Sequence, residues 1–245
     1  MDSYSGIKGF IPVSLLDWPG KVCSIIFLGG CGFRCPACHN HSLVLTPESV
    51  EDHPLEQILE HLKNRANWVD GVTVTGGEPT MRRSLPGLLR VLREYDVAIK
   101  LDTNGSNPVM LEMLLDNELL EAVYMDVKAP LTTHEYSRLA GTRVDVSAIG
   151  RSIRLLKSSG VEVVFRTTVI PGYVEEPEVS RIREVLGEGN RFQIQPFRNI
   201  DTLDKNFGRI DEFRLDRIEE MRMLFEIGLP NGNAGERRSI AGRAG

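Results

Sequence analysis

The sequence predicts an α/β protein in which parallel strands alternate with helices. Short β-branched apolar runs recur along the chain, and the segments between them carry apolar residues at the three- and four-residue spacing of a helix face. Glycine or polar residues directly follow most of the strand-like runs. Because parallel βαβ units bring the carboxyl ends of their strands to one edge, the functional residues are expected along that edge.

The elements follow one another in order. The first strand ends at Gly29-Gly30, the first helix follows Pro54, and the second strand runs into Gly76-Gly77. The strands are expected at residues 22–28, 72–75, 97–101, 122–127, 161–170 and 192–194. The helices are expected at residues 55–62, 85–92, 110–115, 149–156, 179–186 and 218–225. Such a series suits either an open doubly wound sheet or a partial (β/α) barrel.

Length and composition fit one large domain. The chain has 245 residues, of which 41% are hydrophobic and 26% charged, values that exclude a disordered or membrane-spanning protein. The longest apolar run, 22–28, is too short to span a bilayer, and no signal peptide is evident at the start. We therefore expect a cytoplasmic protein with one domain at residues 1–228 and a flexible tail at 229–245.

The charge balance bears on the class of partner. The chain has 29 Lys and Arg against 34 Asp and Glu, which gives a formal net charge of −5. This balance argues against a nucleic-acid binder that neutralises phosphates, and we expect neither a nucleic-acid nor a membrane partner.

Three clustered cysteines suggest a metal centre. Cys31, Cys35 and Cys38 form a C-x3-C-x2-C loop after the first strand, whereas Cys23 lies inside that strand as a small buried hydrophobe. A zinc site would need a fourth ligand such as His39 or His41, and a redox pair of Cys35 with Cys38 would leave Cys31 without a role. Three thiolates on an iron–sulfur cubane leave one iron open to a small molecule.

These residues carry a family resemblance. The cysteine loop is followed by Gly76-Gly77-Glu78-Pro79, and further matching segments lie at residues 15–21, 38–40, 100–106, 125–130 and 165–172. Together they resemble radical S-adenosylmethionine (SAM) enzymes, in particular the activating enzymes of glycyl-radical enzymes, over about residues 9–204. Ala37 departs from the pattern, since many members have an aromatic residue before the third cysteine.

The resemblance implies a fold and two cofactors. The fold is a partial (β/α)6 TIM-like barrel. Cys31, Cys35 and Cys38 would hold a [4Fe-4S] cluster, and SAM would chelate the fourth iron through its amino and carboxylate groups. The carbonyls of the glycine pair and the Glu78 carboxylate could accept from the SAM ammonium group, although Gly76-Gly77 alone also fits an ordinary turn.

The resemblance also assigns roles to polar residues at later strand ends. Asp102 and Asp126, with Thr103 and the Tyr124 backbone, would map to a site for a monovalent cation beside SAM. Lys128 could neutralise the SAM carboxylate, although an Asp126–Lys128 ion pair at the rim is the plain alternative. The cofactor-binding residues expected from these strand ends are Gly76, Gly77, Glu78, Asp102, Asn104, Asp126, Lys128, Arg166 and Arg198.

The implied activity is the formation of a glycyl radical on a partner protein. The closest resemblance is to activating proteins of anaerobic ribonucleotide reductase, with flavodoxin or ferredoxin as the type of electron donor. A radical SAM enzyme acting on a small molecule, similar to 7-carboxy-7-deazaguanine synthase, is the first alternative. A zinc-loop interaction protein is the second, although it would leave the strand-end motifs unexplained.

Overall fold

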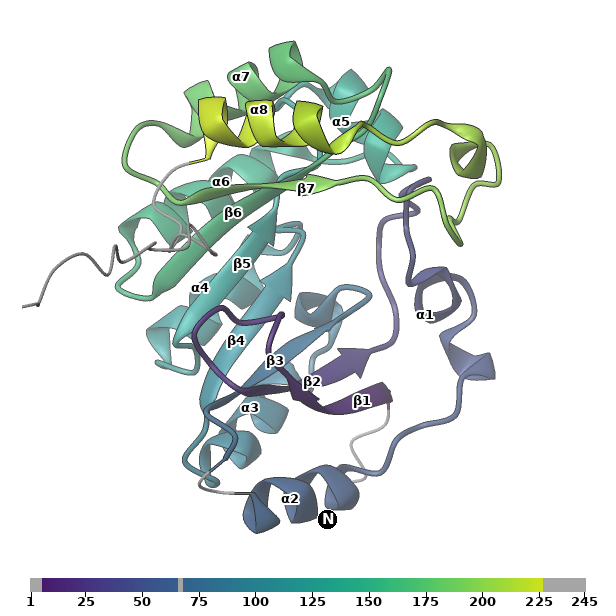
Figure 1. Cartoon of the computed structure of the whole chain (residues 1–245). Helices are drawn as coiled ribbons and strands as arrows, with labels where there is room; N and C mark the ends of the chain where they lie inside the picture. Colours follow the sequence, from purple (N-terminus) through teal and green to yellow (C-terminus); the bar gives the residue numbers. More distant parts are fainter. Residues whose placement is uncertain (1–5, 66–67, 227–245) are drawn as a thin grey trace, which may run out of the picture.

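A computed structural model describes residues 6–65 and 68–226, which form one curved seven-stranded sheet in chain order (Figure 1). The strands are β1 (Ile7–Ser14), β2 (Cys23–Leu28), β3 (Gly71–Gly76), β4 (Ala98–Thr103), β5 (Ala122–Asp126), β6 (Glu162–Val169) and β7 (Phe192–Pro196). All neighbouring pairs from β2 to β7 are parallel, and β1 pairs antiparallel with β2. The order runs from β1 to β7 without a closing pair, so the sheet is an open partial barrel.

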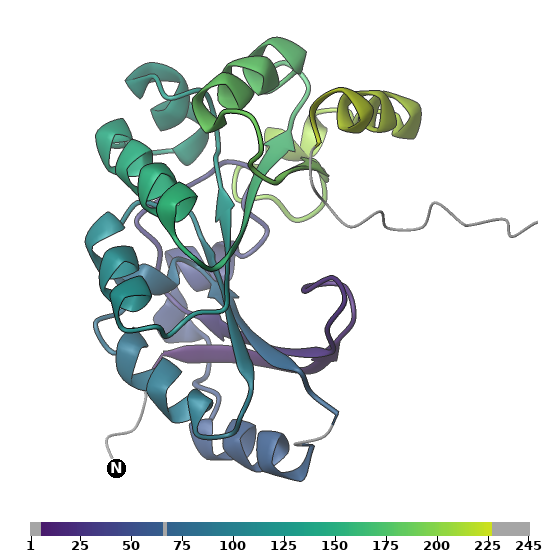
Figure 2. The same ribbon diagram turned by 90° about the vertical axis from the view of Figure 1, so that its left-hand side faces the viewer.

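The helices cover mainly one face of this sheet. They are α1 (His41–Leu45), α2 (Leu55–Asn64), α3 (Leu85–Arg93), α4 (Pro108–Asp116), α5 (Thr133–Ala140), α6 (Val146–Ser158), α7 (Glu176–Leu186) and α8 (Leu215–Phe225). Figure 2 shows the sheet nearly edge-on, with α2 to α7 stacked along its outer side. The turn after β1 and helix α8 lie on the opposite side, so the inner face is left to the site.

The two-residue period of the strands separates a helix-facing side from an inner side. Val72, Val74, Ile99 and Leu101 belong to the main hydrophobic core beneath the helices. The inner side has a smaller apolar cluster, which consists of Trp18, Cys23, Ala122, Tyr124 and Val164 with Ala98 packed against it. This cluster fills the inner face toward the amino ends of the strands, and the polar residues lie toward the carboxyl ends.

All six strands and all six helices expected from the sequence are confirmed. Sequence reasoning missed β1, α1 and α5, together with three short 3-10 helices. Strand β1 contains Gly9 and Pro12, and its pairing with β2 is interrupted by register shifts, so it lacks the regular pattern of a strand.

The tail expected at 229–245 lies outside the described residues. Within the described ranges, no helix combines the length and apolar character needed to cross a lipid bilayer.

Candidate active site

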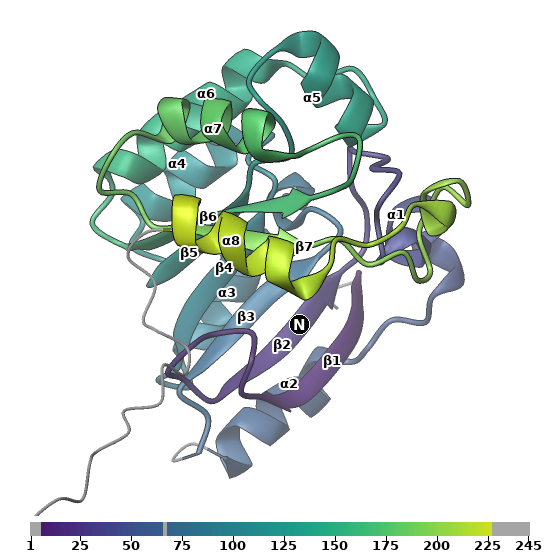
Figure 3. The same ribbon diagram turned by 45° about the horizontal axis from the view of Figure 1, so that its top comes forward.

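The carboxyl ends of the parallel strands surround a cavity of about 850 Å³. Figure 3 shows the inner face from above, with β7 and α8 along one side and β1 along the other. The predicted site residues that line the cavity are Cys31, Cys35, Cys38, Gly76, Gly77, Asp102, Asn104, Asp126, Lys128, Arg166 and Arg198. The structure therefore brings together strand-end residues that are up to 167 positions apart, Cys31 and Arg198.

The start of the cysteine loop is fixed against the end of β3. The Gly30 carbonyl accepts from the Glu78 amide at 2.8 Å, and the Gly30 amide donates to the Leu43 carbonyl at 2.8 Å. A Cβ at Gly77 would lie 2.1 Å from the Gly30 carbonyl oxygen, so only glycine allows this approach. The glycine pair thus serves to seat the cysteine loop as well as to line the cavity.

Helix α5 fixes the middle of the loop. The Arg34 amide donates to the Ala140 carbonyl at 2.7 Å, and the Phe33 ring packs edge-on against Tyr136 with centroids 6.4 Å apart. Gly141 ends α5 with a φ of +63°, and a Cβ there would lie 1.9 Å from the Arg34 carbonyl oxygen. This contact depends on a glycine.

The end of the loop is held by the segment after β7. The amide of Leu203 donates to the Cys38 carbonyl and that of Asp204 to the Pro36 carbonyl, both at 3.0 Å. Three separate parts of the fold therefore hold one loop in place, which preorganises its thiols for a metal centre.

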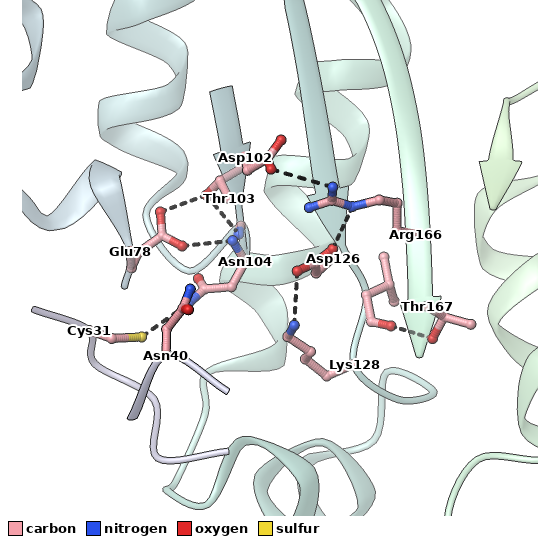
Figure 4. A network of polar contacts seen from close by, with 12 residues as sticks. Cys31, Asn40, Glu78, Asp102, Thr103, Asn104, Asp126, Lys128, Arg166 and Thr167 are labelled. Atoms are coloured by element: carbon pink, nitrogen blue, oxygen red, sulfur yellow. Dashed lines mark hydrogen bonds and ion pairs between the residues drawn. The ribbon is translucent and has the colours of Figure 1, made fainter. Parts of the chain in front are cut away.

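The three thiols suit an iron–sulfur cluster in their chemistry. All are free and partly buried, and burial raises the pKa of each, that of Cys31 to about 11. The Phe33 amide donates to Cys31 Sγ at 3.3 Å, and Asn104 Nδ2 lies 3.8 Å from the same sulfur (Figure 4). Soft thiolates with nearby N–H donors are the surroundings that iron–sulfur centres use, so the donor set fits the group.

The two histidines considered as zinc ligands have other partners. His39 Nε2 lies 2.9 Å from the Arg198 carbonyl oxygen, and His41 Nε2 lies 3.0 Å from Asp201. In residues 6–65 and 68–226, no three or more Cys, His, Asp and Glu side chains are grouped as ligands of a single metal ion.

The Glu78 side chain, expected beside SAM, is buried behind the cavity wall. It is 1% exposed and is absent from the cavity lining. Its carboxylate accepts from the Thr103 hydroxyl and the Asn104 amide, both at 2.7 Å (Figure 4). It also accepts from the Thr80 amide at 3.1 Å. Burial raises the pKa of Glu78, and these donors work against that effect. Glu78 therefore positions the strand end that carries Asn104.

The neighbouring glycine carbonyl has one partner already. Asn40 Nδ2 donates to the Gly76 carbonyl oxygen at 3.0 Å, and both residues line the cavity. A carbonyl oxygen has a second lone pair, so Gly76 can still accept from a ligand.

A row of ion pairs crosses β4, β5 and β6 inside the cavity (Figure 4). Arg166 Nε donates to Asp126 at 2.8 Å and its Nη1 to Asp102 at 3.4 Å, while Lys128 Nζ donates to Asp126 at 3.0 Å. Burial alone would raise the pKa of Asp126, but the two cations outweigh it and hold the pKa at about 2. The Asp126–Lys128 pair is therefore present, and both partners also line the cavity.

Arg198 lines the cavity edge, but its charge is directed elsewhere. Its guanidinium donates to Glu212 at 2.7 Å, and more than half of the side chain is exposed. Arg198 is therefore the one predicted cofactor-binding residue whose charge is paired with a carboxylate outside the ion-pair row.

Several lining residues were not predicted as site residues. Thr168, Gln193 and Gln195 line the cavity on β6 and β7, and Leu16 approaches from the turn after β1. Lys100 lies buried under Asp102. Polar residues at alternate positions of buried strands, as at Arg166 and Thr168, were the signal that could have found them.

A family model described as the radical SAM superfamily matches residues 25–182, more than half of the chain. The protein belongs to the radical SAM superfamily. As a radical SAM enzyme it uses a [4Fe-4S] cluster and S-adenosylmethionine, and its cysteine loop and cavity fit this pair. This membership also contradicts the alternative of a zinc-loop interaction protein.

The radical SAM enzyme has relatives along most of its length. A protein of Methanocaldococcus jannaschii assigned to the glycyl-radical enzyme activating enzymes is 29% identical over 228 residues, which cover 90% of each chain. Pyruvate formate-lyase 1-activating enzyme of Escherichia coli is 26% identical over 227 residues, or 87% of this chain and 88% of that one. The protein is thus a radical SAM enzyme homologous to activating enzymes of glycyl-radical enzymes.

Solved structures support the fold. TYW1 with a lysine-pyruvate adduct bound has a TM-score of 0.60 at 16% identity, and the match covers 83% of this chain and 72% of that chain. Streptococcus suis SuiB bound to its precursor peptide SuiA has a TM-score of 0.61 at 17% identity, with 81% and 44% covered. The chain therefore spans less than half of SuiB, and at these identities both matches concern the fold.

Proposed function

We propose that this radical SAM enzyme activates an anaerobic ribonucleotide reductase by removing a hydrogen atom from a glycine Cα of that partner. The observation that carries the proposal is the cavity itself, which joins the three-cysteine loop to a row of charged strand-end residues. The full-length relatives named as activating enzymes support a glycyl-radical enzyme as substrate. The motif resemblance to activating proteins of the anaerobic reductase supports this partner in particular.

The residues of the cavity divide into two groups in this proposal. Cys31, Cys35 and Cys38 would hold three irons of the cluster as thiolates. Lys128 and Arg166 would attract the SAM carboxylate, because the row together with the buried Lys100 has three cations to two carboxylates.

The hydrogen-bonding groups complete the pocket. The free lone pair of the Gly76 carbonyl would accept from the SAM ammonium group. Asn104, positioned by Glu78, lies between the cluster loop and the ion-pair row, and its amide would contact the cofactor next to Cys31.

The cofactors supply the radical chemistry when they are bound: one electron from the reduced cluster cleaves SAM to methionine and a 5′-deoxyadenosyl radical, which takes a hydrogen atom to become 5′-deoxyadenosine. A flavodoxin or ferredoxin would supply the electron. Transfer from glycine is downhill because the unpaired electron of a glycyl radical is delocalised between the flanking amide nitrogen and carbonyl, whereas the primary alkyl radical has no such delocalisation.

The test is anaerobic incubation of the reduced enzyme and SAM with the anaerobic reductase of the same genome. We expect the electron paramagnetic resonance doublet of a glycyl radical, and none with the Cys35→Ala enzyme or with a reductase whose radical-bearing glycine is replaced by alanine. SAM cleavage without the doublet would contradict the proposed partner. If a small molecule then stimulated cleavage, the small-molecule alternative would be favoured.

A further inference from the structure

A lysine is buried beneath the ion-pair row. Lys100 lies on β4 two residues before Asp102, so both side chains point to the inner face of the sheet. Its side chain is 0% exposed, and its ammonium group pairs directly with the Asp102 carboxylate. A fully buried lysine is rare in proteins and requires a partner that offsets its desolvation.

Lys100 has two kinds of contact that favour a cation at this point. Besides the Asp102 carboxylate, its Nζ lies 4.3 Å from the centroid of the Tyr124 ring on β5. The negative face of an aromatic ring attracts cations at this distance. Burial and the charge of Arg166 lower the pKa of the Lys100 ammonium, and Asp102 works in the opposite direction.

The charges around Asp102 and Asp126 do not suit a bound metal cation. These two carboxylates contact Lys100, Arg166 and Lys128, so three cations surround two anions with a formal net charge of +1. Alkali metal ions bind through oxygen atoms, and a carboxylate that is already paired with ammonium and guanidinium groups attracts them less. The carboxylates expected to bind a monovalent cation already have cationic partners.

We propose that the Lys100 ammonium group is the resident cation of the SAM pocket, and that it holds the Asp102 carboxylate in place without a bound alkali metal ion. An ammonium group has the charge of K⁺ and a similar size. It is attached to β4, so it cannot be diluted or exchanged. Lys100 is thus a positioning residue, and this inference holds whichever molecule donates the hydrogen atom.

The experiment compares cations at constant ionic strength. The reconstituted wild-type enzyme and the Lys100→Ala enzyme are placed in chloride salts of K⁺, Na⁺ or tetramethylammonium. Tetramethylammonium is too large to occupy the space that the Lys100 ammonium group leaves in the variant. The affinity for SAM and the melting temperature are measured in each salt. Lys8→Ala is the matched control, because Lys8 is also largely buried and pairs with Asp52 at 2.8 Å outside the cavity.

The wild-type enzyme should have the same SAM affinity and melting temperature in all three salts. In tetramethylammonium, Lys100→Ala should bind SAM about tenfold more weakly or worse, because the group that orients Asp102 is gone. K⁺, Na⁺ or added methylammonium should restore affinity and raise the melting temperature of this variant in a saturable way. Lys8→Ala should lose thermal stability without any response to the cation.

Two results would overturn the inference. One is a wild-type enzyme that loses SAM affinity in tetramethylammonium, since a metal ion would then be needed despite Lys100; this arm applies even if Lys100→Ala does not fold. The other is a folded Lys100→Ala enzyme that responds to no cation, with or without weaker SAM binding. That result would leave Lys100 with a structural role only or with none.

Discussion

The cysteine side chains are held where a bare thiolate is unfavourable. Burial raises the pKa of Cys31, Cys35 and Cys38, so without metal these groups are protonated at neutral pH. Cluster binding must therefore displace three protons. The positive charge of the irons then stabilises the three thiolates, which are too buried for water to solvate fully. Cys23 is also buried, but it packs in the inner apolar cluster rather than in the cavity.

Replacing the loop cysteines one at a time tests this division. Each of Cys31→Ala, Cys35→Ala and Cys38→Ala should abolish cluster binding, while Cys23→Ala should retain about four irons per chain after anaerobic reconstitution. Iron and sulfide analysis with the visible absorption spectrum gives the readout. Zinc in the purified protein with no uptake of iron would contradict the assignment.

Between elements, α5 packs closely against the cysteine loop, with the Arg34 amide donating to the Ala140 carbonyl at 2.7 Å. Gly141 makes it possible, because any Cβ there would collide with the Arg34 carbonyl. Gly172 provides a comparison: its φ is +74°, similar to that of Gly141, but a Cβ would meet nothing within 4 Å. Substitution of either glycine introduces similar backbone strain, but only substitution of Gly141 also disturbs the contact between α5 and the loop.

Gly141→Ala and Gly172→Ala should therefore have similar backbone strain but different iron contents after reconstitution. Each should cost on the order of 1 kcal/mol in unfolding free energy because a side chain is forced into the left-handed region. Only Gly141→Ala should also push α5 away from the loop and lower cluster occupancy. Equal iron content in the two reconstituted variants would show that this contact does not organise the loop.

How much of this arrangement the sequence predicts depends on the regularity of each element. The strands β2 to β7 contain β-branched or aromatic apolar residues, and their polar ends predicted eleven of the residues that line the cavity. Helix α5 has only Tyr136, Leu139 and Ala140 as buried residues. They have the spacing of a helix face but cover little more than one turn, so the sequence signal is short. A strand-end motif does not reveal which way a carboxylate turns, and the Glu78 carboxylate turns to the Thr103 hydroxyl and the Asn104 amide behind the cavity wall.

At the scale of the whole molecule, the row of ion pairs connects β4, β5 and β6 across the cavity. Asp126 on β5 is opposite Arg166 on β6 in register, and Arg166 reaches Asp102 on β4. Because the folded pKa of Asp126 is about 2, below its usual value near 4, its ionised form stabilises the fold above pH 4. That stability is lost as the pH falls through 4 toward 2.

The apo protein should therefore lose on the order of 2 kcal/mol of unfolding free energy through Asp126 between pH 5 and pH 2. Asp126→Asn should be less stable at pH 5 and should have a flatter pH dependence over this interval. The exposed Asp116→Asn serves as control and should follow the wild type. Urea unfolding at several pH values measures the slopes, and equal slopes for wild type and Asp126→Asn would show that another group is responsible.

In the proposed function, a glycine of a partner protein gives up its hydrogen atom at the cavity of the open barrel. The most direct measurement uses anaerobic ribonucleotide reductase with deuterium at its glycine Cα positions. After incubation with reduced enzyme and unlabelled SAM, mass spectrometry of the 5′-deoxyadenosine should find one deuterium per molecule. Formation of 5′-deoxyadenosine without deuterium would contradict the account.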